Sequence, residues 1–201
     1  MGIVLAGGKS SRFGADKAVA ILGGETLLSR ACRRAAPQVE TLLISRGDTA
    51  HAPQGFELLP DEYPGEGPLA GILAGMARAR SRGYPLLATF ACDTPFVPAN
   101  SVDLLRDGLS GTVADYCVTR RDGVEHHAIA LWRVRCLETL STAFSAGLRG
   151  LCGVSDVLRK TIAEFPMSGE GPEGDAFFNI NTAKDLAGAE RWLASHQAGA
   201  D

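Results

Sequence analysis

The sequence predicts an α/β protein with a three-layer, Rossmann-like arrangement, in which a mainly parallel sheet is flanked by helices. Short apolar runs rich in Leu or β-branched residues recur along the chain, and stretches with helical spacing separate them, as in sheets buried on both faces. The chain has 201 residues and a hydrophobic content of 45%, enough for one sizeable core. We therefore expect a single domain over residues 1–201.

The expected strands are five apolar runs that each end at a polar or glycine-rich segment. They lie at residues 3–6, 42–45, 86–91, 116–119 and 128–132. Between the second and third runs, Leu69, Ile72, Leu73 and Met76 recur at the i, i+3, i+4, i+7 spacing of one helix face. Pro68 suits the first turn of this helix.

Two further helices are predicted from their start signals. Residues 100–103 and 182–185 both resemble capping boxes, with Asp in place of the usual Glu. The helix after residue 185 carries Leu186, Trp192 and Leu193, and we expect it to pack on the sheet.

Charge and cysteine content exclude several classes of partner. Twenty Lys and Arg against 23 Asp and Glu give a net charge of −3, so no positive field would hold nucleic acid or an anionic membrane surface. No apolar run approaches the ~18 residues of a membrane span. The five cysteines are widely spaced and form no Cys-x-x-Cys pair, which favours a reducing cytoplasm.

The stretch LAGGKSSRFGADK, residues 5–17, follows the first apolar run. Gly7 and Gly8 let backbone amides approach a ligand, and Arg12 and Lys17 could neutralise phosphate oxygens. The spacing fits neither the Gly-x-Gly-x-x-Gly nor the Gly-x-x-x-x-Gly-Lys-Ser/Thr loop, so a dehydrogenase or a P-loop NTPase is not expected. The alternative is a glycine-rich turn with ordinary surface cations.

Two segments could supply oxygen ligands for a metal. Asp93 follows the most apolar run of the chain, and a carboxylate there suits Mg²⁺ held against nucleotide phosphates. Asn179 and Asn181 would share one face of an extended segment, and Asn181 could add a neutral ligand. Each could instead be a turn or cap residue. Asp61 ends another apolar run and could face the same cleft or belong to a Pro-Asp turn.

His126 and His127 do not predict a zinc site. Adjacent residues on a strand point to opposite faces, and no Cys or Glu completes a ligand set. One of the two histidines is better suited to line a substrate pocket. The glycine-rich segment 168–175 could close over an acceptor or form a surface insertion.

Taken in order, these motifs resemble the molybdenum cofactor guanylyltransferase (MobA) family, within the nucleotide-diphospho-sugar transferase fold. The motifs are Leu5-Ala6-Gly7-Gly8, Ser10, Arg12, Gly14, Asp16-Lys17, the GPLAG segment, Cys92-Asp93-Thr94-Pro95 and Asn179-x-Asn181-Thr182. The resemblance runs from Ile3 to about Leu193. It implies Mg²⁺-dependent transfer of GMP from GTP to the terminal phosphate of molybdopterin or Mo-molybdopterin, with release of pyrophosphate. An apo-molybdoenzyme or a delivery chaperone would be a further partner.

The resemblance also implies roles for individual residues. Leu5, Ala6 and Gly7, with Gly8 of the same loop, match the nucleotide-binding backbone, and Asp61 matches a further nucleotide contact. Lys17 matches the phosphate-binding lysine, Asp93 the Mg²⁺ ligand and Asn181 a second metal ligand. Arg12, Lys17 and Asp93 are then the expected catalytic residues, because they would offset charge on the leaving pyrophosphate.

Three features depart from the family pattern. Phe13 stands where the motif usually has Met, which is a tolerable apolar exchange. Ser45 stands where we expect an Asn that contacts the nucleotide, and His126-His127 replaces a usual His-Pro. His126, Asn179 and Asn181 are the expected acceptor-binding residues. The nucleotide part would then cover about residues 1–100 and the acceptor part about residues 101–195.

Two alternatives remain open from the sequence. One is a related nucleotidyltransferase that uses CTP or another phosphorylated acceptor, because the fold and phosphate apparatus are shared while base and acceptor pockets vary. The other is a non-catalytic GTP-binding protein that delivers the cofactor. Asp93 counts against the second, because such a protein needs no metal-binding carboxylate.

Overall fold

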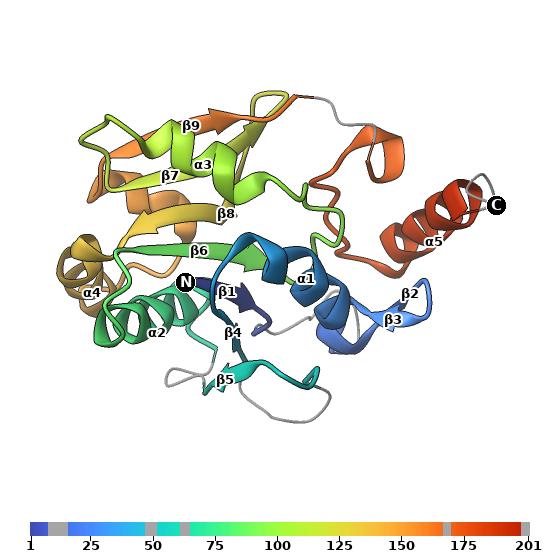
Figure 1. Cartoon of the computed structure of the whole chain (residues 1–201), viewed down its shortest axis with the longest axis horizontal. Coiled ribbons are helices and arrows are strands. Elements are labelled where there is room, and N and C mark those ends of the chain that lie inside the picture. The colour runs from blue at the N-terminus through green and yellow to red at the C-terminus, as the bar shows by residue number, and fades with distance from the viewer. Residues whose placement is uncertain (8–15, 47–51, 61–64, 167–169, 198–201) are drawn as a thin grey trace.

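A seven-stranded sheet forms the centre of the protein (Figure 1). The structure is a computed structural model that describes residues 1–7, 16–46, 52–60, 65–166 and 170–197. The strand order is β5-β4-β1-β6-β8-β7-β9. These strands are β1 (Gly2–Leu5), β4 (Leu42–Ser45), β5 (Glu57–Leu59), β6 (Leu86–Ala91), β7 (Tyr116–Arg121), β8 (Val124–Arg133) and β9 (Lys160–Glu164). Only β8 runs antiparallel to its neighbours, so the predicted mainly parallel sheet is confirmed.

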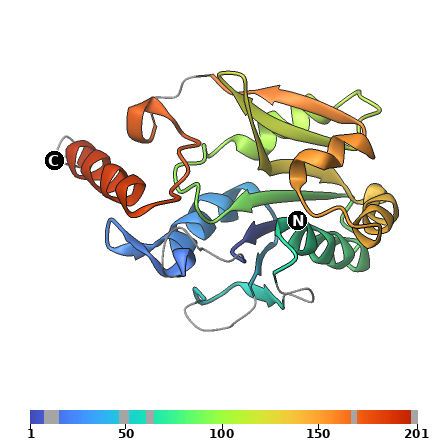
Figure 2. The ribbon, with the colours of Figure 1, turned by 180° about the vertical axis from the view of Figure 1, so that it is seen from behind.

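Helices cover both faces of this sheet, as the views from the two sides show (Figures 1 and 2). The α-helices are α1 (Leu27–Ala35), α2 (Pro68–Ser81), α3 (Ser101–Leu109), α4 (Leu137–Ser145) and α5 (Ala183–Gln197). Short 3₁₀ turns are η1 (Lys17–Val19), η2 (Ala36–Gln38), η3 (Val134–Cys136), η4 (Leu151–Asp156) and η5 (Pro172–Gly174). No helix in these described ranges is long and apolar enough to cross a membrane.

The buried side chains form two layers, one on each face of the sheet. Ile3 and Leu5 of β1 point into the layer under α2 and α4, whereas Val4 points into the layer under α1 and α3. This alternation follows from the two-residue period of a strand. Because both layers are apolar, the central strands read as continuous hydrophobic runs, which is why the sequence shows them clearly.

Short elements outside the apolar runs were not predicted. They are the edge strands β5 and β9 and the hairpin formed by β2 (Ile21–Leu22) and β3 (Glu25–Thr26). Edge strands are half exposed and the hairpin strands have two residues each, so neither produces a long hydrophobic pattern.

The expected packing of the last helix on the sheet is wrong. Helix α5 instead contacts the β2–β3 hairpin, with Leu193 in a separate cluster beside Leu22 and Leu27. The Trp192 ring meets Phe96 edge-on at 5.0 Å. An amphipathic pattern indicates that a helix has an apolar face, but it does not indicate which element packs against that face.

One predicted capping box is confirmed and the other is wrong. At the start of α5, the Asp185 carboxylate accepts hydrogen bonds from the amides of Asn181 and Thr182 at 3.0 and 2.8 Å, and Thr182 Oγ1 accepts one from the Asp185 amide. Asn100 makes no such bond at α3. There the Gln38 side chain, distant in sequence, accepts from the Val102 amide at 3.0 Å.

Candidate active site

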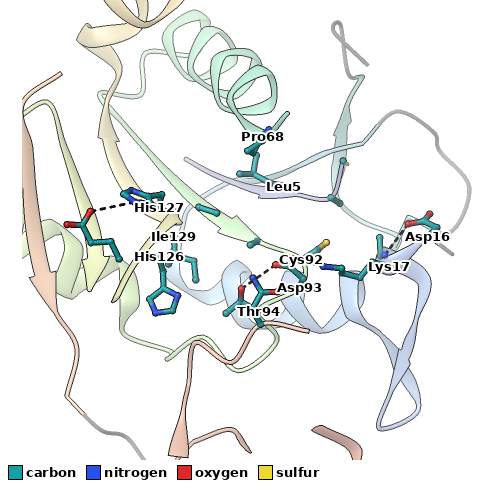
Figure 3. A pocket seen from close by; sticks show the side chains of 17 residues that line it. Leu5, Asp16, Lys17, Pro68, Cys92, Asp93, Thr94, His126, His127 and Ile129 are labelled. Atoms are coloured by element: carbon teal, nitrogen blue, oxygen red, sulfur yellow. Dashed lines mark hydrogen bonds and ion pairs between the residues drawn. The ribbon is translucent and has the colours of Figure 1, made fainter. Parts of the chain in front are cut away.

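A cavity of about 430 Å³ opens at the edge of the sheet where the parallel strands end (Figure 3). Its lining comes from the ends of β1 and β6, from η1, from the first half of β8 and from the segment before α5. These residues are Leu5, Ala6, Gly7, Asp16, Lys17, Ala18, Pro68, Ala91, Cys92, Asp93, Thr94, Glu125, His126, His127, Ala128, Ile129 and Asn179. Open α/β sheets bind ligands at this edge.

Lys17 and Asp93, which line the cavity, meet Asn181, which is not part of the lining, although the three residues are far apart in sequence. The Lys17 ammonium donates to Asp93 Oδ2 at 3.0 Å and to Asn181 Oδ1 at 2.8 Å. The Lys17 and Asp93 side chains keep only 13% and 22% of their exposure, and they point toward one another in Figure 3. Two oxygen ligands thus converge on a single cationic position.

The main chain sets the position of Asp93. Residue 92 continues the ladder beyond β6, with the Cys92 amide donating to the Leu5 carbonyl at 3.2 Å. The Asp93 carbonyl then accepts from the Ile180 amide at 2.9 Å. Asn181 follows directly and is fixed by the capping box of α5, so backbone contacts bring both oxygen ligands together.

Asp16 and Arg46 fix the turn η1, on which Lys17 lies. Asp16 caps η1, accepting from the Ala18 amide at 3.0 Å, and its other oxygen pairs with the guanidinium of Arg46. Arg46 follows β4 and is 5% exposed, so its charge is compensated by this carboxylate. In the sequence, Asp16 stands out only as part of a motif and Arg46 does not stand out, because no periodicity relates the end of β4 to η1.

A register shift in β8 shapes the other end of the cavity. Val118 pairs with Ala130 but the next residue of β7, Thr119, pairs with His126, so three residues of β8 bulge from the ladder. Because of the bulge, both His126 and His127 line the cavity. The expectation that adjacent histidines face opposite sides of a regular strand is therefore wrong at this position.

The two histidines have different surroundings. His126 stacks on Phe177, with 4.8 Å between ring centroids, and burial lowers the pKa of His126 below its usual value. His127 Nε2 lies 3.6 Å from Glu125 Oε2. Lys160 binds both oxygens of Glu125, at 2.8 and 2.7 Å, and this contact lowers the pKa of Glu125. Because burial favours the uncharged form of His126, its ring is a neutral, planar part of the cavity lining near neutral pH.

The other residues expected at the site fall into three groups. Leu5, Ala6, Gly7 and Asn179 line the cavity. Ser45 is 6% exposed and lies under α2, where a Cβ on Gly71 would come within 2.6 Å of Ser45 Oγ, and it is not part of the lining. Gly8, Arg12 and Asp61 lie outside the described residues, as do residues 168–169 of the glycine-rich segment.

The oxygen atoms at the Lys17 end suit a hard divalent cation. Carboxylate and amide oxygens are ligands that Mg²⁺ and Mn²⁺ accept, and those of Asp93 and Asn181 already bind a cation, the Lys17 ammonium. Within the described part of the chain, no group of three or more His, Cys, Asp or Glu could hold a metal. A metal there would take the rest of its ligands from substrate phosphates or water.

Comparison with known proteins places this chain in a family. Residues 2–164 match the profile of the MobA-like NTP transferase domain. The molybdenum cofactor guanylyltransferase of Cereibacter sphaeroides (strain ATCC 17023) is 40% identical over 195 residues, which cover 96% of each chain.

Solved structures share the fold. Molybdopterin-guanine dinucleotide biosynthesis protein A from Archaeoglobus fulgidus superposes with a TM-score of 0.76 at 23% identity, covering 97% of this chain and 100% of that one. Rv0371C from Mycobacterium tuberculosis, in complex with manganese, gives a TM-score of 0.65 at 17% identity, covering 94% and 97%. The chain therefore has the nucleotide-diphospho-sugar transferase fold, and it belongs to the MobA-like NTP transferase family, a family of nucleotidyltransferases.

Proposed function

We propose that this protein transfers GMP from GTP to the terminal phosphate of molybdopterin, or of Mo-molybdopterin, and releases pyrophosphate. The observation that carries this proposal is the convergence of Lys17, Asp93 and Asn181 beside a cavity that His126 and Asn179 also line. The name of the Cereibacter sphaeroides relative supports guanine as the base and the molybdenum cofactor as the acceptor.

The reaction needs no nucleophile from the protein. An acceptor phosphate oxygen attacks the α-phosphorus of GTP, the new P–O bond forms, and the bond to the bridging oxygen of pyrophosphate breaks. The task of the chain is to hold two anions that repel each other and to offset the charge on the leaving group. Lys17 and the backbone around Gly7 bind the donor phosphates, and Arg12 joins them in this proposal.

Asp93 and Asn181 would hold a divalent cation, Mg²⁺ in this proposal, because their oxygens already converge on one cation. When bound, the cation would supply positive charge that offsets the charge on the reacting phosphates. Asp61 and Ser45 remain predicted nucleotide contacts, and the division near residue 100 into donor and acceptor parts remains a prediction. A cytoplasmic location and transfer of the product to a chaperone or an apo-molybdoenzyme also belong to this proposal.

The test is reconstitution from purified components. Wild-type protein is incubated with molybdopterin, Mg²⁺ and either GTP or CTP, and pyrophosphate release and the dinucleotide product are measured. We expect product with GTP, and we expect Asp93→Ala to reduce turnover by a factor on the order of 10²–10³ while it remains folded. Asp103→Ala is the control, because Asp103 lies on α3 in an exposed ion pair with Arg106.

Each alternative has its own outcome. Product with CTP and none with GTP would identify a cytidylyl-transferring relative. Binding of GTP without pyrophosphate release, under conditions in which the protein is folded and loaded with metal, would favour a delivery protein. Full activity of Asp93→Ala would remove Asp93 from the metal site.

A further inference from the structure

Residues 175–181, here called the strap, carry both site asparagines along the edge of the sheet. Phe177 and Ile180 are buried at 1% and 0% exposure, whereas Asn179 and Asn181 are exposed and Asn179 lines the cavity. A segment outside helix and strand has few main-chain bonds of its own, so contacts with other elements decide where its side chains lie. The question is what holds each end of the strap.

The end at residue 181 is fixed by the contacts that join Lys17, Asp93 and Asn181. The Ile180 amide donates to the Asp93 carbonyl at 2.9 Å, and Asn181 Oδ1 accepts from Lys17 at 2.8 Å. The capping box at Asp185 adds a third contact. These bonds tie this end to the donor side of the cavity.

The end at residue 175 is held by Arg121, the last residue of β7. Arg121 is 5% exposed, and its Nη1 donates to Asp175 Oδ1 at 2.9 Å. The same oxygen accepts from the Phe177 amide at 2.9 Å, so one carboxylate joins the strand to the turn of the strap. Only Arg121 of this pair is buried: the Asp175 side chain keeps 37% of its exposure, and Arg121 Nε also lies 3.4 Å from Asp122 Oδ2. Asp175 is therefore one of two carboxylates that compensate the buried Arg121 charge, and the one that connects it to the strap.

Phe177 carries this anchor to the cavity. Its ring stacks on His126 at 4.8 Å and meets Phe165 edge-on at 5.0 Å. We propose that Arg121, through Asp175, is a positioning residue for the acceptor: it holds the strap so that Phe177 supports His126 and Asn179 faces the cavity. The inference rests on the proposed function, because it assigns His126 and Asn179 to the acceptor.

The neighbouring arginine provides a matched control. Arg120 precedes Arg121 on β7 and points to the opposite face of the sheet, where it pairs with Glu164 of β9 in an exposed contact. Substituting either arginine with Met removes one charge from the same strand. Of the two arginines, Arg121 is the one whose side chain pairs with the strap.

Steady-state kinetics separate the two arginines. We expect Arg121→Met to raise the KM for molybdopterin about tenfold, since small displacements of positioning groups cost up to about 10²-fold, and to leave the KM for GTP within about twofold. Arg120→Met should change neither value. Arg121→Lys, which keeps the charge, should recover part of the loss, and Asp175→Asn should act in the same direction as Arg121→Met.

A measurement without substrates tests the anchor separately. Hydrogen exchange in peptides that cover residues 175–181 should be faster in Arg121→Met than in wild type, and unchanged in Arg120→Met. If the wild-type protein does not transfer GMP, the proposed function fails, but this exchange difference still decides whether Arg121 holds the strap. Should Arg121→Met not fold, Asp175→Asn carries the same comparison, because its amide oxygen can still accept from Phe177.

Three outcomes would overturn the inference. The first is an equal KM for molybdopterin in Arg121→Met and Arg120→Met. The second is a parallel rise of both KM values in Arg121→Met, which would indicate a general structural role. The third is unchanged exchange in residues 175–181 in the variants of Arg121 and Asp175.

Discussion

At the scale of single residues, we expect Lys17 to take part in both metal binding and nucleotide binding. Its ammonium lies 3.0 Å from Asp93 Oδ2 and 2.8 Å from Asn181 Oδ1, so it pairs with the carboxylate and binds the amide oxygen that we assign to the metal. A metal at this position would compete with the ammonium, and donor phosphates would then provide the ammonium with a new partner. Metal binding and nucleotide binding should therefore favour each other.

The substitution Lys17→Met tests this coupling, because it should change the affinities for GTP and for Mn²⁺ in opposite directions. It should weaken GTP binding, because a phosphate contact is lost. It should also strengthen Mn²⁺ binding without nucleotide by about fivefold, because an ion pair worth up to about 1 kcal/mol no longer competes. Calorimetry measures both affinities, and Lys184→Met, which removes an exposed charge on α5, is the control. Weaker Mn²⁺ binding in Lys17→Met would contradict the competition.

His126 predicts a dependence of stability on pH. Burial lowers the pKa of His126 in the folded chain, whereas the unfolded chain keeps a value of about 6.5. As the pH falls through about 6.5, the unfolded chain takes up a proton at His126 before the folded chain does. The free energy of unfolding therefore decreases on acidification through this range, and His126 causes no such loss at higher pH.

The measurement is the unfolding temperature of wild type and His126→Asn between pH of about 7.5 and 5.5. The wild-type value should fall more steeply on acidification than that of His126→Asn. His196→Asn is the control, because His196 is exposed on α5. Equal slopes in wild type and His126→Asn would show that His126 titrates alike in both states.

At the scale of elements, the start of α5 links helix stability to the site. The capping box that satisfies the first amides of α5 also fixes the backbone of Asn181. The helix packs on the β2–β3 hairpin rather than on the sheet. A helix at the periphery thus determines where a proposed metal ligand lies.

The substitution Thr182→Ala should lower the free energy of unfolding by about 1 kcal/mol, the usual effect of losing an N-cap side chain. Chemical denaturation measures it. Ser195→Ala, near the other end of α5, removes a hydroxyl that donates to the Trp192 carbonyl and should have a smaller effect. Equal losses in the two variants would contradict a specific contribution from the cap.

At the scale of the whole molecule, one sheet edge gathers residues from positions 5 to 179. The ends of β1 and β6, the bulge of β8 and the strap all contribute to a single cavity. A ligand that bridges these elements binds the folded chain and not the unfolded one, so it should raise the unfolding temperature.

GTP with Mg²⁺ at about 100 times its Kd should stabilise the protein by about 2.7 kcal/mol. For a chain of this size that corresponds to a rise of about 5–10 °C in the unfolding temperature. A thermal-shift series with GTP, CTP, UTP and ATP measures it, and GTP should give the largest rise. No rise with GTP would argue against this cavity as the donor site.

The mainly parallel α/β core and the candidate residues Lys17, Asp93, Asn181 and His126 could be predicted from the sequence alone. The glycine-rich stretch 5–17 remains a predicted phosphate-binding loop, because residues 8–15 lie outside the described part of the chain. These features are local: buried strands have continuous apolar runs, and loops at their ends have fixed composition. The family resemblance also depended on local motifs in order along the chain, which is why it could be recognised without a structure.

The residues that surround those candidates could be identified only from the tertiary structure. The buried arginines Arg46 and Arg121, the bulge that turns both histidines to the cavity and the packing of α5 all depend on contacts between distant segments. Periodicity reports which face of an element is apolar, but it carries no information about the partner of a buried charge. That partner is fixed only when the chain folds, because the cost of burying the charge must be met by a specific carboxylate.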